Sequence, residues 1–270
     1  MSNIDKVFSG SIPEIYDTYL VPLIFLDYAE DMANKVAVSN PAHVLETAAG
    51  SGVVTRALAP KLSADAKYTV SDLNQPMLDR AAAMQHDAGR ISWQQADAME
   101  LPFADDAFDI VCCQFGVMFF PNHVDGFKEA LRVLKPGGKF IFNVWDKIEE
   151  NDFAHIVTGA AVSVFPNDPP VFLARTPHGY HDTALIHDDL AMAGFSNIEL
   201  ETTTETSTAP SARDAAIAYC QGTPLRMELE ALDASRLEEV TDIATQAIER
   251  QYGNGPVSGK IRAHTFSASS

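Results

Sequence analysis

Between residues 42 and 144, short apolar runs alternate with segments of helical spacing, and this alternation restricts the possible folds more than any other feature of the chain. The pattern predicts strands at 44–46, 68–72, 91–95, 108–114 and 140–144. It predicts helices at 53–62, 74–88 and 122–134, the last two capped by Asn74 and Asn122. Strands that alternate with helices form βαβ units, so this region should build an open, mostly parallel α/β sheet with helices on both faces.

The segments around this region are mainly helical. Capping-box spacing at 11–14 predicts a helix with Pro13 at its first position, and a second helix should follow Pro22 and end before Asn40. The run 135–138, Lys-Pro-Gly-Gly, should turn the chain before the strand at 140–144. The remaining expected elements are helices at 149–165 and 182–193, strands at 198–206 and 261–266, and helical spacing over 211–252.

This pattern predicts a division of the chain. We expect an N-terminal helical lid at 1–38 and a ligand-binding domain at 39–270, with helical cap insertions at about 149–182 and 211–256. The two late strands would bring the sheet to seven strands.

Charge and cysteine content exclude several kinds of partner. The chain has 37 acidic and 19 basic residues, a formal net charge of -18 and no basic cluster, so it would repel the phosphates of a nucleic acid. The acidity can also serve solubility alone. The three cysteines have neither disulfide nor metal-ligand spacing, and no apolar run approaches the ~20 residues of a membrane helix. We therefore expect a cytoplasmic protein without a metal or membrane insertion; no pattern indicates its oligomeric state.

The loop after the first strand, residues 46–52, indicates what the sheet binds. Ligands of open α/β sheets lie beyond the carboxyl ends of the strands, where glycines let the backbone approach them, although glycines also form ordinary turns. Asp72 ends the next strand, where a carboxylate can accept both hydroxyls of a ribose. Glu46 would repel a diphosphate and attract an ammonium group, and Thr55 replaces the third glycine of a dinucleotide loop. The expected ligand combines a nucleoside with a cation, as S-adenosylmethionine does.

Five motifs, in order, resemble those of class I S-adenosylmethionine-dependent methyltransferases, in particular small-molecule and quinone-type members. They are Val44-Leu-Glu-Thr-Ala-Ala-Gly-Ser-Gly52, Ser71-Asp-Leu-Asn74, Gln95-Ala-Asp-Ala-Met-Glu-Leu-Pro-Phe103, Phe108-Asp-Ile-Val-Cys-Cys-Gln-Phe-Gly116 and Leu134-Lys-Pro-Gly-Gly-Lys139. The resemblance is close over 42–144 and implies a Rossmann-like sheet, methyltransferase activity and S-adenosylmethionine as cofactor. Ala48 stands where the family usually has glycine. Because alanine resists positive φ, we expect ordinary backbone angles at this position.

The resemblance also implies roles for individual residues. The expected cofactor-binding residues are Tyr19, Glu46, Ala48, Gly50, Gly52, Asp72, Leu73, Met77, Asp97, Ala98, Gln114 and Phe115. Those of the first motif would hold the methionine end, and Asp72 would accept the ribose hydroxyls. Leu73 and Met77 would flank the adenine, Asp97 would accept from its amino group, and Ala98 would donate through its backbone. The two residues on the fourth strand would lie beside the sulfonium. Asp97 can equally cap the turn that follows it.

The expected partner is a small organic methyl acceptor, because a large helical cap suits an enclosed ligand. Candidate contacts with it are Tyr16, Met118 and Trp145, although Tyr16 and Met118 can also belong to the core.

No catalytic residue is assigned from the sequence. Methyl transfer from a sulfonium depends on alignment, and a base is needed only for acceptors of low acidity. His123, His178 and His181 are candidates, but each also fits a packing or surface role. Two other functions stay open, a non-catalytic S-adenosylmethionine-binding scaffold and a nicotinamide-dependent oxidoreductase, of which Glu46 and Thr55 disfavour the second.

Overall fold

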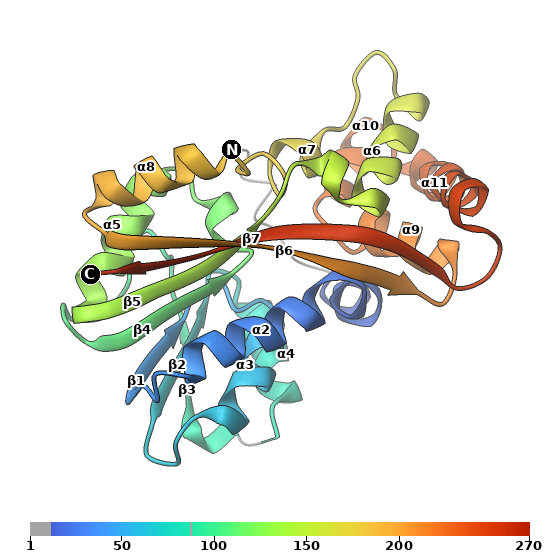
Figure 1. Ribbon diagram of the computed structural model, residues 1–270. Coiled ribbons are helices and arrows are strands. Elements are labelled where there is room, and N and C mark those ends of the chain that lie inside the picture. Colours follow the sequence, from blue (N-terminus) through green and yellow to red (C-terminus); the bar gives the residue numbers. More distant parts are fainter. Residues whose placement is uncertain (1–11, 87) are drawn as a thin grey trace. The chain divides into compact units, whose positions relative to one another are not determined.

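The computed structural model describes residues 12–86 and 88–270 and contains a seven-stranded sheet of order β3-β2-β1-β4-β5-β7-β6 (Figure 1). The strands are β1 (His43–Glu46), β2 (Lys67–Asp72), β3 (Ile91–Gln95), β4 (Phe108–Gln114), β5 (Leu134–Trp145), β6 (Ser196–Ala209) and β7 (Val257–Ser269). Strands β1 to β5 pair in parallel, and the strand order reverses between β1 and β4. The expected α/β class with a mostly parallel, seven-stranded sheet is confirmed.

Helices connect these strands. The α-helices are α1 (Ile12–Ile15), α2 (Leu26–Ala37), α3 (Val53–Leu58), α4 (Gln75–Met84), α5 (His123–Val133), α6 (Asp152–Val164), α7 (Phe172–Arg175), α8 (Thr183–Ala193), α9 (Ala212–Gln221), α10 (Leu225–Asp233) and α11 (Leu237–Tyr252). A π-helical stretch, η2 (Tyr16–Phe25), precedes α2. Short 3₁₀ turns are η3 (Ala59–Lys61), η4 (Ala88–Arg90), η5 (Val117–Phe119), η6 (Ile148–Glu150) and η7 (Ala234–Arg236).

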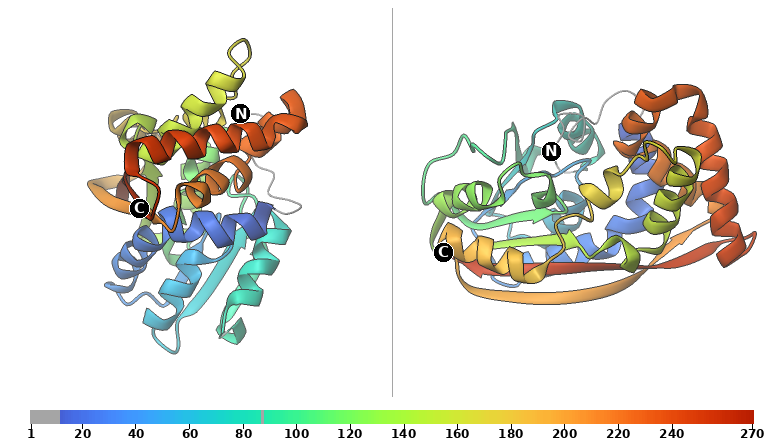
Figure 2. Two further views of the ribbon diagram at one scale, coloured as in Figure 1. Left: turned by 90° about the vertical axis from the view of Figure 1, so that its right-hand side faces the viewer. Right: turned by 90° about the horizontal axis from the view of Figure 1, so that it is seen from above.

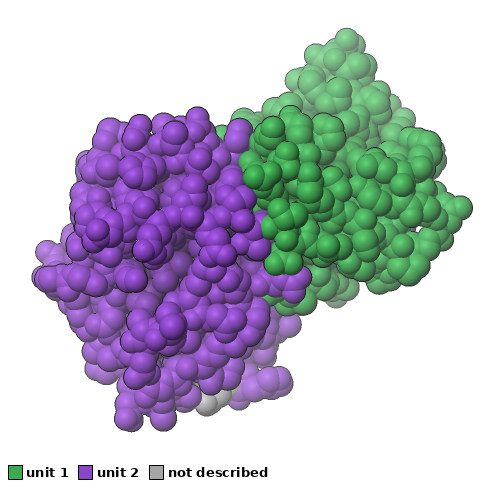
Figure 3. All heavy atoms as spheres, in the orientation of Figure 1, with its two compact units in different colours: residues 1–26, 145–180, 204–263 green, residues 27–144, 181–203, 264–270 purple. Residues whose placement is uncertain are grey.

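The chain forms two compact units, which Figure 3 colours separately. Unit 2, purple in Figure 3, contains 27–144, 181–203 and 264–270. Within it, α2, α3 and α4 cover one face of the sheet and α5 and α8 the other (Figures 1 and 2). Unit 1, green in Figure 3, contains the described parts of 1–26, 145–180 and 204–263, where α6, α9 and α11 pack against one another.

Aromatic rings form much of the core of unit 2. The ring of Phe127 on α5 lies 5.9 Å from that of Phe140 and 5.2 Å from that of Phe142, both on β5. Phe142 in turn stacks on Phe266 of β7 at 5.3 Å. Each fully buried ring contributes roughly 1.5–3 kcal/mol by removal from water, so this cluster fixes α5 against the sheet.

The N-terminal helices differ from the prediction. Ser11 and the residues before it lie outside the described residues. From Ile12 to Ala37 the chain is continuously helical, and Pro22 lies inside the π-helical stretch instead of starting a second helix. Proline has no N–H to donate and clashes with the preceding turn of an α-helix, and the wider π-helical turn accommodates both defects.

The turn predicted at 135–138 lies inside a strand. β5 begins at Leu134, and its register with β4 shifts so that Phe108 pairs with Leu134 while Ile110 pairs with Lys139. The extra residues therefore form a bulge. Gly137 has a φ of 80°, which only glycine adopts without strain, and this explains why the bulge falls on the Pro-Gly-Gly sequence.

The two predicted asparagine caps behave differently. Asn122 caps α5, with its side-chain oxygen accepting from the Asp125 N–H at 3.2 Å. Asn74 precedes α4 but makes no side-chain capping bond, and its own N–H donates to Asp72 at 2.7 Å. The helix expected at 74–88 ends at Met84. Asn74 therefore belongs to the carboxyl end of β2 more than to the helix.

We expect Asn122→Ala to lower the free energy of unfolding by about 1 kcal/mol, because α5 loses the acceptor for an N-terminal N–H group. Asn74→Ala, the matched variant, should cost less than half as much. Urea unfolding followed by circular dichroism measures both. Equal losses in the two variants would contradict the assignment of a cap to Asn122 alone.

Candidate functional site

The loop between β1 and α3 turns through three left-handed residues. The φ angles are 52° at Ala48, 56° at Gly50 and 80° at Gly52. The prediction of ordinary backbone angles at Ala48 is therefore wrong. A left-handed conformation costs an L side chain about 1–2 kcal/mol. The loop accommodates the extra methyl because its neighbour is small: a Cβ added to Gly116 would lie 2.5 Å from the Ala48 Cβ.

Backbone hydrogen bonds join this loop to the ends of the neighbouring strands. The Ala49 N–H donates to the Ser71 carbonyl at 3.0 Å, and the Gly50 N–H donates to the Asp72 carboxylate at 2.8 Å. Asp72 is 6% exposed; burial raises its pKa, and the hydrogen bonds from Asn74 and Gly50 oppose that rise. The structure thus brings together Gly50 and Asp72, two of the predicted cofactor residues, at the point where the strand order reverses.

Glu46 lies below this loop in a closed set of hydroxyl groups. Its Oε2 accepts from the Thr55 hydroxyl at 2.7 Å and from the Tyr68 hydroxyl, and its side chain is buried. Burial raises the pKa of Glu46 to about 7, although the hydrogen bonds from Tyr68 and Thr55 favour the ionised form. In the sequence, Thr55 stands out only because it replaces a glycine, and Tyr68 belongs to none of the motifs. The only sequence feature that could have indicated these partners of Glu46 is the hydroxyl of Thr55 in the first turn of α3.

The third motif lies beside the second. The Ala96 N–H donates to the Asp72 carbonyl at 3.0 Å, and the Gln95 side chain donates to the Leu73 carbonyl at 2.9 Å. The Asp97 carboxylate accepts from the Met99 N–H at 2.9 Å, as a residue that caps a turn would do. Its role toward adenine stays a prediction.

The residues expected to flank the adenine differ in exposure. Leu73 is 39% exposed, whereas Met77 is 2% exposed and packs in the core. Ala98 follows Asp97 in the same turn and is partly exposed. Leu73 is therefore the more accessible of the two apolar candidates.

The tip of β4 is held in a strained conformation by a neighbouring strand. Phe115 has a φ of 51°, and its N–H donates to the side-chain oxygen of Asn143 at 2.9 Å. Asn143, on β5, pairs with Gln114 of β4 and is fully buried. Sequence reasoning missed Asn143, since an asparagine late in an apolar strand has no motif. Met118, a candidate substrate contact, is 2% exposed and buried.

Two polar atoms near these elements are buried without partners among the described residues. They are the Ser51 hydroxyl oxygen in the loop and the Asn143 amide nitrogen. An unpaired buried polar group costs about 1–3 kcal/mol, so each needs an explanation. Ser51 lies in the glycine loop and Asn143 lies on β5 beside the β4 tip, so both atoms could accept or donate a further hydrogen bond there.

The other predicted residues belong to unit 1. There the rings of Tyr16 and Phe25 lie 5.4 Å apart, those of Phe25 and Trp145 6.0 Å, and those of Trp145 and His178 6.2 Å. We call these four residues the aromatic row. It joins two candidate substrate contacts, Tyr16 and Trp145. Tyr19 is partly exposed.

The three candidate histidines have different surroundings. The His178 Nδ1 lies 2.9 Å from the Asp146 carbonyl oxygen, which can only accept, so the Nδ1 carries a proton. Burial lowers the pKa of His123. His181 is partly exposed. None of this assigns a catalytic base.

Across 12–86 and 88–270, no group of three His, Cys, Asp or Glu side chains is arranged to hold a metal ion. No helix in the same ranges is both long and apolar enough to cross a membrane.

Comparison with known proteins agrees with this geometry. Residues 45–142 match a family model described as a methyltransferase domain. A ubiquinone/menaquinone biosynthesis C-methyltransferase of Rickettsia felis is 35% identical over 130 residues, which cover 46% of this chain and 52% of that protein. The chain thus spans about half the length of the curated relatives it matches.

Solved structures share the fold. The YcgJ protein of Bacillus subtilis has a TM-score of 0.55 and 16% identity, over 88% of this chain and 97% of that one. An S-adenosylmethionine-dependent methyltransferase of Thermotoga maritima has a TM-score of 0.56 and 14% identity, over 100% and 99%. At these identities the likeness shows the fold alone.

The match over residues 45–142 confirms, for that part of the chain, the resemblance of its motifs to class I S-adenosylmethionine-dependent methyltransferases. S-adenosylmethionine is the cosubstrate that this domain implies, so the cofactor prediction is confirmed at that level. The individual binding residues stay predictions.

The buried Glu46 should make stability depend on pH. With a folded-state pKa of about 7, against an ordinary 4.5, the folded protein holds a proton between these values that the unfolded chain has lost. Stability should therefore fall as pH rises through this window, by at most about 1 kcal/mol per pH unit. Glu46→Gln, which cannot ionise, should remove this part of the slope.

Urea unfolding of both proteins at pH 5, 6, 7 and 8 measures the difference. The two proteins share all other titrating groups. The difference between their free energies of unfolding at each pH therefore gives the contribution of Glu46. Parallel curves for the two proteins would show that Glu46 is already ionised at pH 5.

Proposed function

We propose that this chain transfers the methyl group of S-adenosylmethionine to a small organic acceptor enclosed under a helical cap. The observation that carries the proposal is the hydrogen bond of 2.8 Å from the Gly50 N–H to the Asp72 carboxylate. It places a left-handed glycine loop and an acid at one edge of a parallel sheet, where ligands of such sheets bind. The matched methyltransferase model covers the same elements.

In this proposal the cofactor lies across the carboxyl ends of β1, β2 and β4. The loop from Glu46 to Gly52 would hold the methionine end, and Asp72 would accept the ribose hydroxyls. Glu46, protonated in part near neutral pH because it is buried, would ionise beside the ammonium group. Ser51 and Asn143 carry the orphaned polar atoms that are available for further hydrogen bonds.

The cap is also a proposal. It would consist of the lid at 1–38 and the insertions at about 149–182 and 211–256, which contain helices α6, α7, α9, α10 and α11. The relatives named as quinone-biosynthesis C-methyltransferases, together with the aromatic row, support a flat, aromatic acceptor. Bound S-adenosylmethionine supplies an activated methyl group, so the chain's own contribution is alignment and exclusion of water.

We also propose that the protein is cytoplasmic and that nucleic acid is not its partner. All three cysteines are free and buried, which fits a reducing cytoplasm. The net charge of -18 disfavours nucleic acid as a partner.

The proposal is tested in two steps. S-adenosylhomocysteine should raise the melting temperature and NAD should not; the reverse result would favour an oxidoreductase. Labelled S-adenosylmethionine is then offered with a panel of phenols, hydroquinones, thiols and amines. Saturable cofactor binding with no transfer to any acceptor would favour the non-catalytic scaffold.

Asp72→Ala should weaken S-adenosylhomocysteine binding by about 1–3 kcal/mol, because buried ribose hydroxyls lose a charged acceptor. Asp72→Asn keeps the shape and the bond to the loop, and should lose somewhat less. Asp79→Ala, on the exposed side of α4, is the matched control and should leave binding unchanged. Isothermal titration calorimetry measures all three, and an unchanged affinity in Asp72→Ala would remove Asp72 from the site.

A further inference from the structure

Tyr68 belongs to none of the motifs, yet its hydroxyl donates to an acid of the proposed cofactor loop. Near the start of β2, Tyr68 pairs with Val44 of β1, which lies two residues before Glu46. Two residues of a strand span roughly 6.6 Å, so the Tyr68 side chain must extend along the sheet for its hydroxyl to reach the Glu46 carboxylate. A serine or threonine at position 68 would be too short to make this contact.

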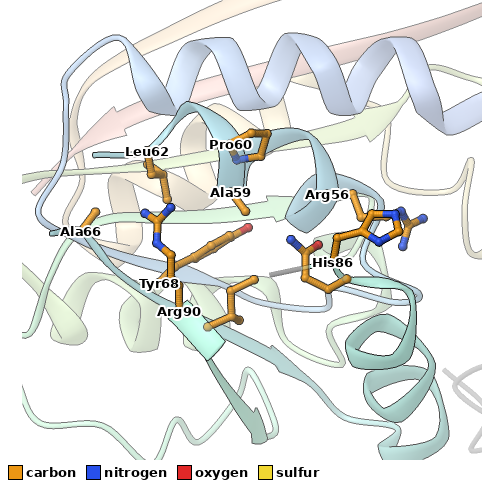
Figure 4. A pocket seen from close by; sticks show the side chains of 10 residues that line it. Arg56, Ala59, Pro60, Leu62, Ala66, Tyr68, His86 and Arg90 are labelled. Carbon is orange, nitrogen blue, oxygen red and sulfur yellow. The ribbon is translucent and has the colours of Figure 1, made fainter. Parts of the chain in front are cut away.

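The packing of Tyr68 is separate from its hydrogen bond. Tyr68 is buried, and together with apolar residues such as Leu62 and Ala66 it lines a pocket of about 290 Å³ (Figure 4). Phenylalanine at this position would keep the ring and lose only the hydroxyl. Burial raises the pKa of Tyr68 well above its ordinary value, so the hydroxyl keeps its proton near neutral pH and donates it to Glu46.

The two hydroxyls that contact Glu46 donate to the same oxygen. Both Tyr68 and Thr55 donate to Oε2, and the residues that the structure describes donate no hydrogen bond to Oε1. Two donors from different elements, β2 and α3, fix the orientation of the carboxylate. Oε1 is then the oxygen that an ammonium group at the loop would meet.

The charge of Glu46 is balanced between opposing influences. Burial raises its pKa to about 7, while Arg56 on α3 favours the ionised form and Asp72 on β2 opposes it. Cys112 and Cys113 on β4 also face Glu46, but burial raises the pKa of both thiols, so they are neutral. Because the carboxyl group titrates near neutral pH, the loss of one hydroxyl donor would change its charge in this range.

We propose that Tyr68 is a positioning residue, whose hydroxyl orients Glu46 and favours its ionised form so that the site selects a cofactor that carries an ammonium group. Tyr68 acts through Glu46 and does not itself contact the cofactor. The inference rests on the proposed function, because it takes Glu46 as the partner of the ammonium group of S-adenosylmethionine.

The proposal determines the direction of a pH dependence. Below the pKa of Glu46, an ammonium group can pair with this residue only after a proton leaves it, so affinity should rise with pH up to about 7 and then level off. A hydroxyl that donates to a carboxylate lowers its pKa. Without the Tyr68 hydroxyl the pKa of Glu46 is higher, and the rise in affinity should continue to a higher pH.

The experiment measures binding of S-adenosylhomocysteine and of its deaminated analogue, in which hydrogen replaces the α-ammonium group, by calorimetry at pH 6, 7 and 8.5. In Tyr68→Phe we expect S-adenosylhomocysteine to bind about 10-fold more weakly at pH 6 and less than about 2-fold more weakly at pH 8.5. This corresponds to an upward shift of about one pH unit, as expected for one lost hydrogen bond to a charged group. The analogue should not bind more weakly at any of these values.

Two further variants separate this role from general effects. Thr55→Val removes the second donor and should act in the same direction as Tyr68→Phe. Tyr252→Phe, the matched control, removes a tyrosine hydroxyl that donates to the Asp152 carboxylate at 2.8 Å in unit 1, and should leave both affinities unchanged. In a Glu46→Gln background, Tyr68→Phe should change the affinity for S-adenosylhomocysteine by less than about 2-fold, because glutamine does not ionise.

The outcomes distinguish this inference from the proposed function. An equal loss at every pH, or an equal loss for the two ligands, would show that Tyr68 only supports the structure and would overturn the inference. So would an unchanged affinity in Tyr68→Phe at pH 6. If the unsubstituted protein bound neither ligand, the proposed function itself would be contradicted.

Discussion

The hydrogen bond from the Gly50 N–H to the Asp72 carboxylate organises the rest of the candidate site. It ties the first strand-to-helix loop to the end of the second strand, and the Ala49 bond to Ser71 reinforces it. Asp72 also accepts from Asn74, so one buried carboxylate fixes both the loop and the entry to α4. Because its charge is held by backbone N–H groups, Asp72 can remain in a buried position that would otherwise favour its neutral form.

The close approach of the loop to its neighbours depends on small residues. A Cβ on Gly52 would lie 2.9 Å from the Ala81 Cβ of α4, and one on Gly116 would lie 2.5 Å from that of Ala48. The space between the loop and the β4 tip therefore holds one Cβ, that of Ala48, and leaves no room for a second at position 116. The family's glycine is replaced at position 48 at the cost of some backbone strain, while position 116 remains glycine and keeps the contact possible.

Much of the fold could be predicted from the sequence because it depends on local periodicity. The β3 and β4 limits agree with the predicted ones, and the α8 N-cap Asp182 and the left-handed Gly194 after it fit the predicted helix 182–193. The predictions were wrong where one local sequence pattern is compatible with more than one backbone conformation. Pro22 fits a π-helical turn as well as a helix start, and Pro-Gly-Gly forms a bulge as well as a turn. Only packing chooses between these outcomes.

The candidate site was less predictable, because a motif gives the type of a residue and not its partners. The sequence located Glu46 and assigned it to an ammonium group, but could not show that Tyr68 and Thr55 both donate to it. Those two donors lie 22 and 9 residues further along the chain, and only the sheet and α3 bring them together.

The surroundings of Glu46 set what the loop can do electrostatically. Two hydroxyls favour its charge, yet complete burial opposes that charge more strongly, so the carboxyl group stays protonated in part near neutral pH. A cation bound near the loop would favour the ionised form of Glu46. Binding of the cation would then release a proton from Glu46 to the solvent.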